Sequence, residues 1–273
     1  YVESDVVVNR INNGETATHT IQASGMVGYV GGVAARVGSF VATDIASNTL
    51  SISATNSMAD LNYVSGVIAY SQGNITLVTG ASERIGRTIA LTLAKQGATI
   101  AVHYNSNREQ AEQTVVQIKS LGGHAQTFQA DLGSFEDVQQ LKIDIEQSLG
   151  TVTSIINNAG YAQFKSFFDY SPLEWQKELN ICLNGVMHLA YVFLPTMRQQ
   201  KHGKFITIIG DSARTGDRKL IASATARGGV ISFIKSLAQE VGRDQIQCNV
   251  ISIGLIDQDD LQLSNDVKKQ IIK

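Results

Sequence analysis

Asn74-Ile-Thr-Leu-Val-Thr79 runs directly into Gly80-Ala-Ser-Glu-Arg-Ile-Gly86. This stretch is the strongest indication of the fold. It has the pattern of a buried strand that turns through glycines into a helix, the context in which a Gly-rich turn binds a dinucleotide. Gly80 permits the tight turn. Gly86 lets the helix N-terminus approach a pyrophosphate, whose negative charge the helix dipole favours. We therefore expect residues 74–86 to begin a nucleotide-binding βαβ unit.

Candidate strands and helices alternate through the rest of residues 74–273. The strand candidates are rich in Val and Ile with little polar alternation, which is typical of buried parallel strands. Ser134 and Ser171 are each followed three residues later by an acidic residue, a pattern that starts a helix. Repeated βαβ units predict an α/β fold with a doubly wound parallel sheet. The six expected strands are Asn74–Thr79, Thr99–His103, His124–Gln129, Ser154–Asn157, Lys204–Ile209 and Gln247–Ile251.

Two further motifs follow the Gly-rich turn, Asp131-Leu132 and Asn157-Asn158-Ala159-Gly160. In this order the three motifs resemble the short-chain dehydrogenase/reductase family. The resemblance implies a Rossmann-like domain that binds a nicotinamide nucleotide, with Asp131 at the adenine and Asn158–Gly160 along the nucleotide channel. Taken alone, Asn158 also fits the cap of a strand end, and Asp131 also fits a carboxylate that starts the next turn. The cofactor residues implied are Gly80, Ser82, Arg84, Ile85, Gly86, His103, Tyr104, Asn105, Ser106, Asp131, Leu132, Asn158, Ala159, Gly160 and Arg227.

The end of the second expected strand favours NADP(H) over NAD(H). A carboxylate there holds the ribose hydroxyl of NAD and repels the extra phosphate of NADP, whereas this chain has His103-Tyr-Asn-Ser-Asn107. Arg84 stands where most relatives have a third glycine, and Arg108 follows the strand. Both guanidinium groups suit charge-assisted hydrogen bonds to a phosphate. Arg at the glycine position, followed by His-Tyr, is similar to a branch that resembles the pteridine reductases.

The catalytic residues that the resemblance implies are all replaced. In the family a Tyr acts as general acid, a Lys lowers the pKa of that Tyr and holds the ribose, a Ser orients the substrate carbonyl, and an Asn keeps a water relay in place. The matching residues here are Cys182 for the Asn, Gly210 for the Ser, Ser223 for the Tyr and Arg227 for the Lys. The last tyrosine of the chain is Tyr191, so no downstream phenol fills the gap.

These replacements predict impaired hydride-transfer chemistry. A Ser hydroxyl is a far weaker acid than a Tyr phenol, and general acid catalysis supplies about 10²- to 10⁴-fold. Asp211 and Ser212 are the possible substitutes, although each also fits a solvated polar residue, and Cys182 fits a buried packing residue better than a nucleophile. We therefore predict a catalytically inactive subunit or sensor. The alternatives are an active NADP-dependent carbonyl or 3-oxoacyl-type oxidoreductase, and a gene fragment joined to a repeat sequence.

Residues 1–73 differ in composition from residues 74–273. They contain only two basic residues, no Lys and no Pro, and are dense in Gly, Ser, Thr, Val and Ala. Tyr29-Val-Gly-Gly-Val-Ala-Ala35 matches Tyr63-Val-Ser-Gly-Val-Ile-Ala69, and each copy follows a strand-like run. Stacked β-repeats and an irregular β extension with a chance match both fit this pattern. We expect a β-rich N-terminal extension over residues 1–73 and the nucleotide-binding domain over residues 74–273.

The end of the chain also departs from the family pattern. The resemblance implies a Pro-Gly pair after the sixth strand, a Thr at the nicotinamide, and then a last helix and strand. This chain has Ile253-Gly254, has Gln258 at the place of the Thr, and ends at Lys273 before that helix and strand. A sheet without its last strand exposes unpaired backbone groups. A longer natural chain, a partner or the N-terminal extension would cover that edge.

Composition narrows the remaining function classes. A net charge of −2 argues against a nucleic-acid partner, which requires a basic excess. Cys182 and Cys248 form neither a disulfide framework nor a metal motif, so we expect no metal site and a reducing, cytoplasmic location. No apolar run reaches the roughly 18 residues of a membrane span. The resemblance implies a homo- or hetero-oligomer with a relative, through helices around residues 172–199 and 222–242.

Overall fold

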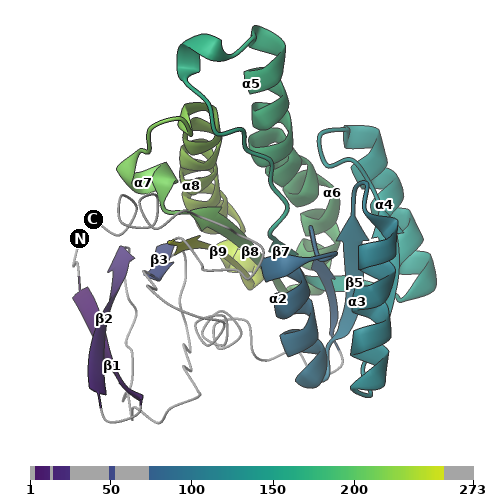
Figure 1. Ribbon diagram of the computed structural model, residues 1–273. Helices are drawn as coiled ribbons and strands as arrows, with labels where there is room; N and C mark the ends of the chain where they lie inside the picture. Colours follow the sequence, from purple (N-terminus) through teal and green to yellow (C-terminus); the bar gives the residue numbers. More distant parts are fainter. Residues whose placement is uncertain (1–3, 13–14, 25–48, 53–73, 255–273) are drawn as a thin grey trace.

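The computed structural model describes residues 4–12, 15–24, 49–52 and 74–254 (Figure 1). The described strands form one sheet in the order β1-β2-β3-β9-β8-β7-β4-β5-β6. Strands β4 to β9 run parallel, and β4 and β7 are neighbours where the strand order reverses, as in a doubly wound fold. All six expected strands are therefore confirmed. They are β4 (Ile75–Val78), β5 (Thr99–Tyr104), β6 (His124–Gln129), β7 (Val152–Asn157), β8 (Gly203–Gly210) and β9 (Ile246–Ile253).

Helices cover both faces of this sheet and bury two apolar cores. Neighbouring strand residues point to opposite faces, so Leu77 lies in one core and Val78 in the other. The Leu77 core includes residues of α4, α6 and α8, and the Val78 core includes residues of α2 and α3. The helices are α2 (Arg84–Lys95), α3 (Arg108–Ser120), α4 (Phe135–Ser148), α5 (Pro172–Leu179), α6 (Gly185–Gln200), α7 (Ser212–Thr215) and α8 (Ile221–Val241), with the π-helix η3 (Asn180–Asn184) and short 3₁₀ turns η2 (Phe167–Asp169) and η4 (Gly242–Asp244).

The expected helix starts are present. The Ser134 hydroxyl caps α4 by accepting a hydrogen bond from the N–H of Asp137. Ser171 and Glu174 form a reciprocal capping box at α5, with Pro172 in the first turn. These local signals are reliable because the side chains satisfy backbone groups that the helix itself leaves unpaired.

One helical stretch, Pro172–Gln200, is long and apolar enough to cross a membrane by length and composition. The sequence had suggested that no stretch reaches this length, because polar residues interrupt its apolar runs. The inward face of α6 packs into the Leu77 core through residues such as Leu189, Phe193 and Met197, which are at most 1% exposed. This packing is that of a core helix beside a sheet.

The N-terminal strands extend the sheet beyond β9. Strands β1 (Ser4–Asn12) and β2 (Glu15–Ser24) pair antiparallel, and β3 (Thr49–Ile52) pairs antiparallel with β2. Strand β3 also pairs parallel with β9, so of the three alternatives for the open edge the structure shows the N-terminal extension. Both copies of the sequence match (29–35 and 63–69) and Gln258 lie outside the described residues. Stacked β-repeats and the domain boundary at residue 73 therefore stay predictions.

Candidate functional site

Two positions in the turn between β4 and α2 accept only glycine. Gly80 has a φ of +61°, in the left-handed region, and a Cβ added to it would lie 3.0 Å from the Cα of Ala159. A Cβ added to Gly86 would lie 2.0 Å from the carbonyl oxygen of Gly80. The first turn of α2 therefore packs directly against the glycine turn, as the sequence predicted.

The N-terminus of α2 differs from those of the next three helices. The side chains of Asn107, Ser134 and Ser171 cap α3, α4 and α5, whereas Glu83 makes no side-chain cap to α2. The first turn of α2 also contains no acidic residue. Since no side chain caps α2 and its first turn lacks an acid, its first N–H groups and its positive dipole end can serve an anion, although the exposed Glu83 directly precedes them. This end of α2 therefore suits a phosphate group.

Arg84 occupies the first residue of α2 with a φ of +51°. An L-residue in this region costs roughly 1–2 kcal/mol, a cost that glycine does not carry. The conformation suits the glycine that the family resemblance implies at this position. It also places an exposed arginine at the start of the helix that faces the glycine turn.

Thr79 and Asn158 lock the turn to the end of β7. The Thr79 hydroxyl donates to Asn157 Oδ1 (2.9 Å) and accepts from the N–H groups of Asn158 (3.0 Å) and Ala159 (2.9 Å). Asn158 Nδ2 donates to the carbonyl oxygens of Thr79 (3.2 Å) and Gly80 (3.3 Å). Asn158 thus acts as the strand-end cap that its sequence position also fitted. These roles of Thr79 and Asn157 were not expected from the sequence. A Thr directly before the first glycine could have suggested the role of Thr79.

His103 lies beneath the turn, because its side chain is 1% exposed. Its Nδ1 accepts from the N–H of Gly80 (3.2 Å), and its Nε2 donates to the carbonyl oxygen of Ala130 (3.1 Å). Burial lowers the pKa of His103 to about 4, so the ring is neutral. Since both ring nitrogens are bonded within the protein, His103 does not offer the cofactor contact expected from the sequence. It instead fixes the turn to the ends of β5 and β6.

The chain just beyond β5 presents polar, exposed residues. Asn105 and Ser106 are exposed, Tyr104 is partly buried, and Asn107 caps α3. Arg108 is exposed and forms an ion pair with Glu112 (2.7 Å). The residues from Tyr104 to Asn107 contain no carboxylate. This edge therefore favours the 2′-phosphate of NADP over the free ribose hydroxyl of NAD.

Asp131 and Leu132 have roles in the local turn. The Asp131 Oδ1 accepts from the N–H of Gly133 (2.9 Å), and its own N–H donates to Asp137 Oδ2 (3.1 Å). Asp131 thus starts the next turn, which was the alternative to an adenine contact. It is exposed just after β6. The Leu132 side chain is 4% exposed and packs in the core, so only its backbone remains for a ligand.

Arg87, which the sequence analysis missed, supports the turn from behind. Its Nε donates to the carbonyl oxygen of Ser82 (3.0 Å) and to the Thr114 hydroxyl (3.0 Å). Its Nη2 donates to Ser82 O (2.6 Å) and to the carbonyl oxygen of Gln110 (3.1 Å). Ser82 is itself buried, and Ile85 packs against the Val78 core. Ser82 and Ile85 therefore shape the turn mainly through backbone and packing.

Cys182 lies in the π-helix η3 between α5 and α6. Its thiol donates to the carbonyl oxygen of Tyr161 (3.1 Å) and accepts from the N–H of the same residue (3.3 Å). Single π-turns inside helices often mark functional sites. The thiol is 4% exposed and holds the chain directly after Gly160, which supports the expectation of a small buried residue.

Ser223 and Arg227 lie one turn apart on α8 and contact each other. The Arg227 Nη1 donates to the Ser223 hydroxyl, and Ser223 is 3% exposed. A Cβ placed on Gly160 would lie 2.6 Å from Arg227 Nη2 and 3.9 Å from Cys182 Sγ. The Arg227 guanidinium and the Cys182 thiol therefore lie close to Gly160, and Arg227 links the Ser223 hydroxyl to them; all three occupy positions that the sequence resemblance assigned to catalysis.

The end of β8 places the two possible substitutes differently. A Cβ on Gly210 would lie 3.5 Å from the Ser212 hydroxyl, so this hydroxyl lies next to the position of the missing Ser. Asp211 Oδ1 instead accepts from the Ser252 hydroxyl (3.1 Å) and pairs with Arg214 (3.3 Å). Ser212 is thus the better placed of the two.

Comparisons with known proteins agree with this geometry. The family model described as short chain dehydrogenase matches residues 74–269. A 3-oxoacyl-(acyl-carrier-protein) reductase of Staphylococcus epidermidis is 31% identical over 201 residues, covering 72% of this chain and 81% of the relative. A 2,3-dihydro-2,3-dihydroxybenzoate dehydrogenase of Bacillus subtilis is 29% identical over 206 residues, covering 74% of this chain and 78% of the relative. The chain therefore belongs to the short-chain dehydrogenase family.

A solved structure shows the same fold. The gluconate 5-dehydrogenase from Burkholderia cenocepacia, in complex with NADP and tartrate, aligns with a TM-score of 0.65 and 23% sequence identity. The alignment covers 74% of this chain and 76% of that chain. The Rossmann-like architecture expected from the sequence is thereby confirmed.

Proposed function

We propose that this chain is an NADP(H)-binding member of the short-chain dehydrogenase family whose hydride-transfer chemistry is impaired. The observation that carries the proposal is the cluster around Gly160. At the place where a phenol and an ammonium are expected, the chain has a Ser223 hydroxyl bonded to the Arg227 guanidinium. The role that follows is a nucleotide-dependent subunit or sensor.

The nucleotide-binding half supports this proposal through its shape and charge. The uncapped start of α2 would hold the pyrophosphate, and Arg84 with the edge from Asn105 to Arg108 would face the extra phosphate of NADP. Arg227 would hold ribose hydroxyls, since a guanidinium has five N–H donors. A bound nicotinamide ring supplies or accepts the hydride. The gluconate 5-dehydrogenase of the same fold was solved with NADP, in keeping with this preference.

Proton delivery is the step that this chain's residues perform poorly. A guanidinium stays protonated at all relevant pH values, so Arg227 stabilises negative charge without giving up a proton. The Ser223 hydroxyl is buried, accepts the Arg227 hydrogen bond and is a weak acid. A carbonyl reduced at this site would lack its usual proton donor, which is worth about 10²- to 10⁴-fold in rate.

A second candidate is an active carbonyl or 3-oxoacyl-type oxidoreductase. Two observations favour it: the Ser212 hydroxyl lies next to the position of the missing Ser, and the relative at 31% identity is a 3-oxoacyl reductase. In this case Ser212 would orient the substrate carbonyl, and the proton would come from solvent or from the substrate.

Two measurements separate these candidates. Titration with NADPH, followed by nucleotide or Trp175 fluorescence, should show saturable binding that is tighter than that of NADH. Ketones, acyl thioesters and pterins should then give no turnover above the uncatalysed rate. An absence of NADPH binding at millimolar concentration would end the nucleotide proposal. Turnover that Ser212→Ala abolishes would establish the second candidate instead.

We also propose that the chain assembles with itself or with a relative, in the cytoplasm. A groove of about 820 Å³ lies between α4, α6 and α8, lined mainly by apolar side chains. Met187 and Tyr191 on this face are 43% and 74% exposed. Of the three helices, α6 and α8 belong to the stretches expected at the interface, and a second subunit would cover the groove. Sedimentation at two protein concentrations tests the assembly.

A further inference from the structure

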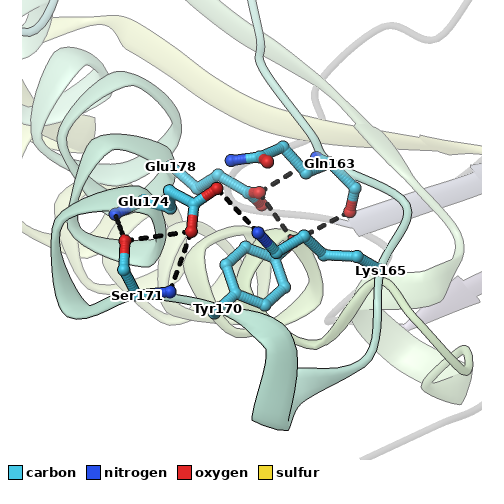
Figure 2. Close-up of polar contacts among 6 residues, drawn as sticks. All are labelled: Gln163, Lys165, Tyr170, Ser171, Glu174 and Glu178. Atoms are coloured by element: carbon cyan, nitrogen blue, oxygen red, sulfur yellow. Dashed lines mark hydrogen bonds and ion pairs between the residues drawn. The ribbon is translucent and has the colours of Figure 1, made fainter.

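A polar cluster joins α5 to the segment that leaves the Gly160 site (Figure 2). Glu178, on α5, is 0% exposed and lies one helical turn before Cys182. A buried carboxylate is costly unless hydrogen bonds compensate it. Glu178 Oε2 is buried and makes no hydrogen bond within the described part of the chain. Glu178 is therefore only partly compensated, which points to a role beyond stability.

The other oxygen of Glu178 holds the backbone of Gln163. Glu178 Oε1 accepts from the N–H of Gln163 at 2.9 Å. One turn along, the Cys182 thiol holds both backbone groups of Tyr161. Two inward side chains of one continuous helical stretch thus fix alternate residues of the segment Tyr161–Gln163. Side chains here satisfy the backbone groups that a neighbouring strand would satisfy in a sheet.

Tyr170 completes the attachment. Its hydroxyl lies 2.8 Å from the carbonyl oxygen of Gln163 and 2.8 Å from Glu178 Oε1. Burial, and then the hydrogen bond to Glu178, raise the pKa of Tyr170 to about 12, so the phenol stays protonated. The single phenol proton can be donated to Gln163 O or to Glu178 Oε1. Either hydrogen bond holds Tyr170 against the segment Tyr161–Gln163.

A surface layer holds Tyr170 in place. Lys165 Nζ lies 4.8 Å from the centre of the Tyr170 ring and 2.6 Å from Glu174 Oε1. Glu174 Oε2 accepts from the N–H and the hydroxyl of Ser171. The hydrogen bond from Lys165, followed by those from Ser171, lowers the pKa of Glu174 to about 2. Figure 2 shows these residues packed around the Tyr170 ring at the start of α5.

We propose that Glu178 and Tyr170 are positioning residues for the Gly160 site. They fix Gln163, and Cys182 fixes Tyr161, so the segment directly after Gly160 cannot shift away from Arg227. Loosening the Gln163 end should release the Tyr161–Cys182 contact and displace Gly160. Access to the Cys182 thiol therefore reports on the position of the segment, and its consequence for nucleotide affinity rests on the proposed function.

The test is alkylation by N-ethylmaleimide, read by mass spectrometry for each cysteine. Tyr170→Phe removes only the hydroxyl and should speed labelling of Cys182 by about tenfold, the value of a buried hydrogen bond to a charged group. Cys248 is 1% exposed, its thiol pKa is raised to about 12 by burial, and it serves as the internal reference. Phe168→Leu, a conservative change at a 92% exposed position two residues before Tyr170, is the control and should leave both rates unchanged.

A second variant and a second readout distinguish positioning from general destabilisation. Glu178→Gln keeps an acceptor for the N–H of Gln163 and should speed Cys182 labelling less than Glu178→Ala does. NADPH affinity should fall severalfold in Tyr170→Phe. An unchanged Cys182 rate, or an equal rise at Cys182 and Cys248, would overturn the proposal. A selective rise at Cys182 in a protein that binds no NADPH would uphold the positioning and refute the proposed nucleotide function.

Discussion

The glycine turn at residues 79–86 and the cluster around Gly160 are both fixed by hydrogen bonds between side chains and backbone, but they differ in chemistry. In the turn, Thr79 and Asn158 hold a backbone that still suits a pyrophosphate. Around Gly160, Cys182 and Arg227 keep the chain in place, yet the position proposed for the acid is a buried serine, Ser223. Positioning of the backbone and acid–base reactivity therefore depend on separate atoms, and one can be lost without the other.

The largest effect is expected from restoring the family's catalytic residues in and near the cluster around Gly160. Cys182→Asn, Gly210→Ser, Ser223→Tyr and Arg227→Lys together should raise kcat/KM for ketone reduction with NADPH by about 10²- to 10⁴-fold, because a general acid is restored. The control carries Phe in place of Ser223 and the same other three changes, so it differs only by the phenol oxygen. An equal gain in both variants would show that the acid is not what is missing.

A smaller effect is expected from disturbing the turn. Gly86→Ala places a Cβ 2.0 Å from the carbonyl oxygen of Gly80, so the backbone must move away from the phosphate position. NADPH affinity, measured by fluorescence titration, should fall by at least about tenfold, or 1.4 kcal/mol. Gly242→Ala is the control, since nothing lies within 4 Å of its added Cβ. Wild-type affinity in Gly86→Ala would contradict the close approach.

The buried ring beneath the turn makes stability depend on pH. His103 titrates at about 4 when folded and at the ordinary 6.5 when unfolded, so between these values the unfolded chain binds more protons. Its contribution is complete above pH 6.5 and is lost as pH falls towards 4, amounting to about 2 kcal/mol at pH 5. Urea unfolding at pH 7 and pH 5 measures this loss. His103→Gln should show a smaller pH difference, and exposed His202→Gln should match wild type.

The smallest effect concerns the strained arginine of the turn. Arg84→Gly should raise the free energy of unfolding by about 1 kcal/mol, because glycine adopts a φ of +51° without strain. It should also reduce the preference for NADPH over NADH, measured as a ratio of dissociation constants. Lys219→Gly is the control, with a φ of +65°, and should leave that ratio unchanged. A preserved preference in Arg84→Gly would remove Arg84 from phosphate recognition.

Much of the fold could be read from local patterns. The six parallel strands were predicted from short runs, β-branched in all but His124–Gln129, and the capping residues Ser134 and Ser171 predicted the starts of α4 and α5. These predictions succeed because a strand or a helix start depends on residues within a few positions of each other. Helix was also expected around residues 172–199, where the stretch Pro172–Gln200 is helical and its apolar residues are spaced along the helix rather than contiguous.

Site roles were harder to predict where partners are distant in sequence. His103 was expected among the cofactor residues that favour NADP, but its ring bonds Gly80 and Ala130, residues from other parts of the chain. Arg87 gave no sequence signal, although it holds Ser82 O against α3. Glu178 gave no sequence signal either, and only packing shows that it is buried and bonded to Gln163. Such roles depend on long-range contacts that no local pattern encodes.

The amino-acid sequence alone was enough to predict the family and the βαβ order, because glycine spacing and residue type are local properties. The packing of distant segments was needed to show that Cys182 and Arg227 approach Gly160, that Arg227 bonds Ser223, that His103 is buried, and that β3 lies beside β9. Burial and contact arise when distant segments pack together. The sequence gives the chemical groups of each side chain, whereas the fold determines which groups it contacts.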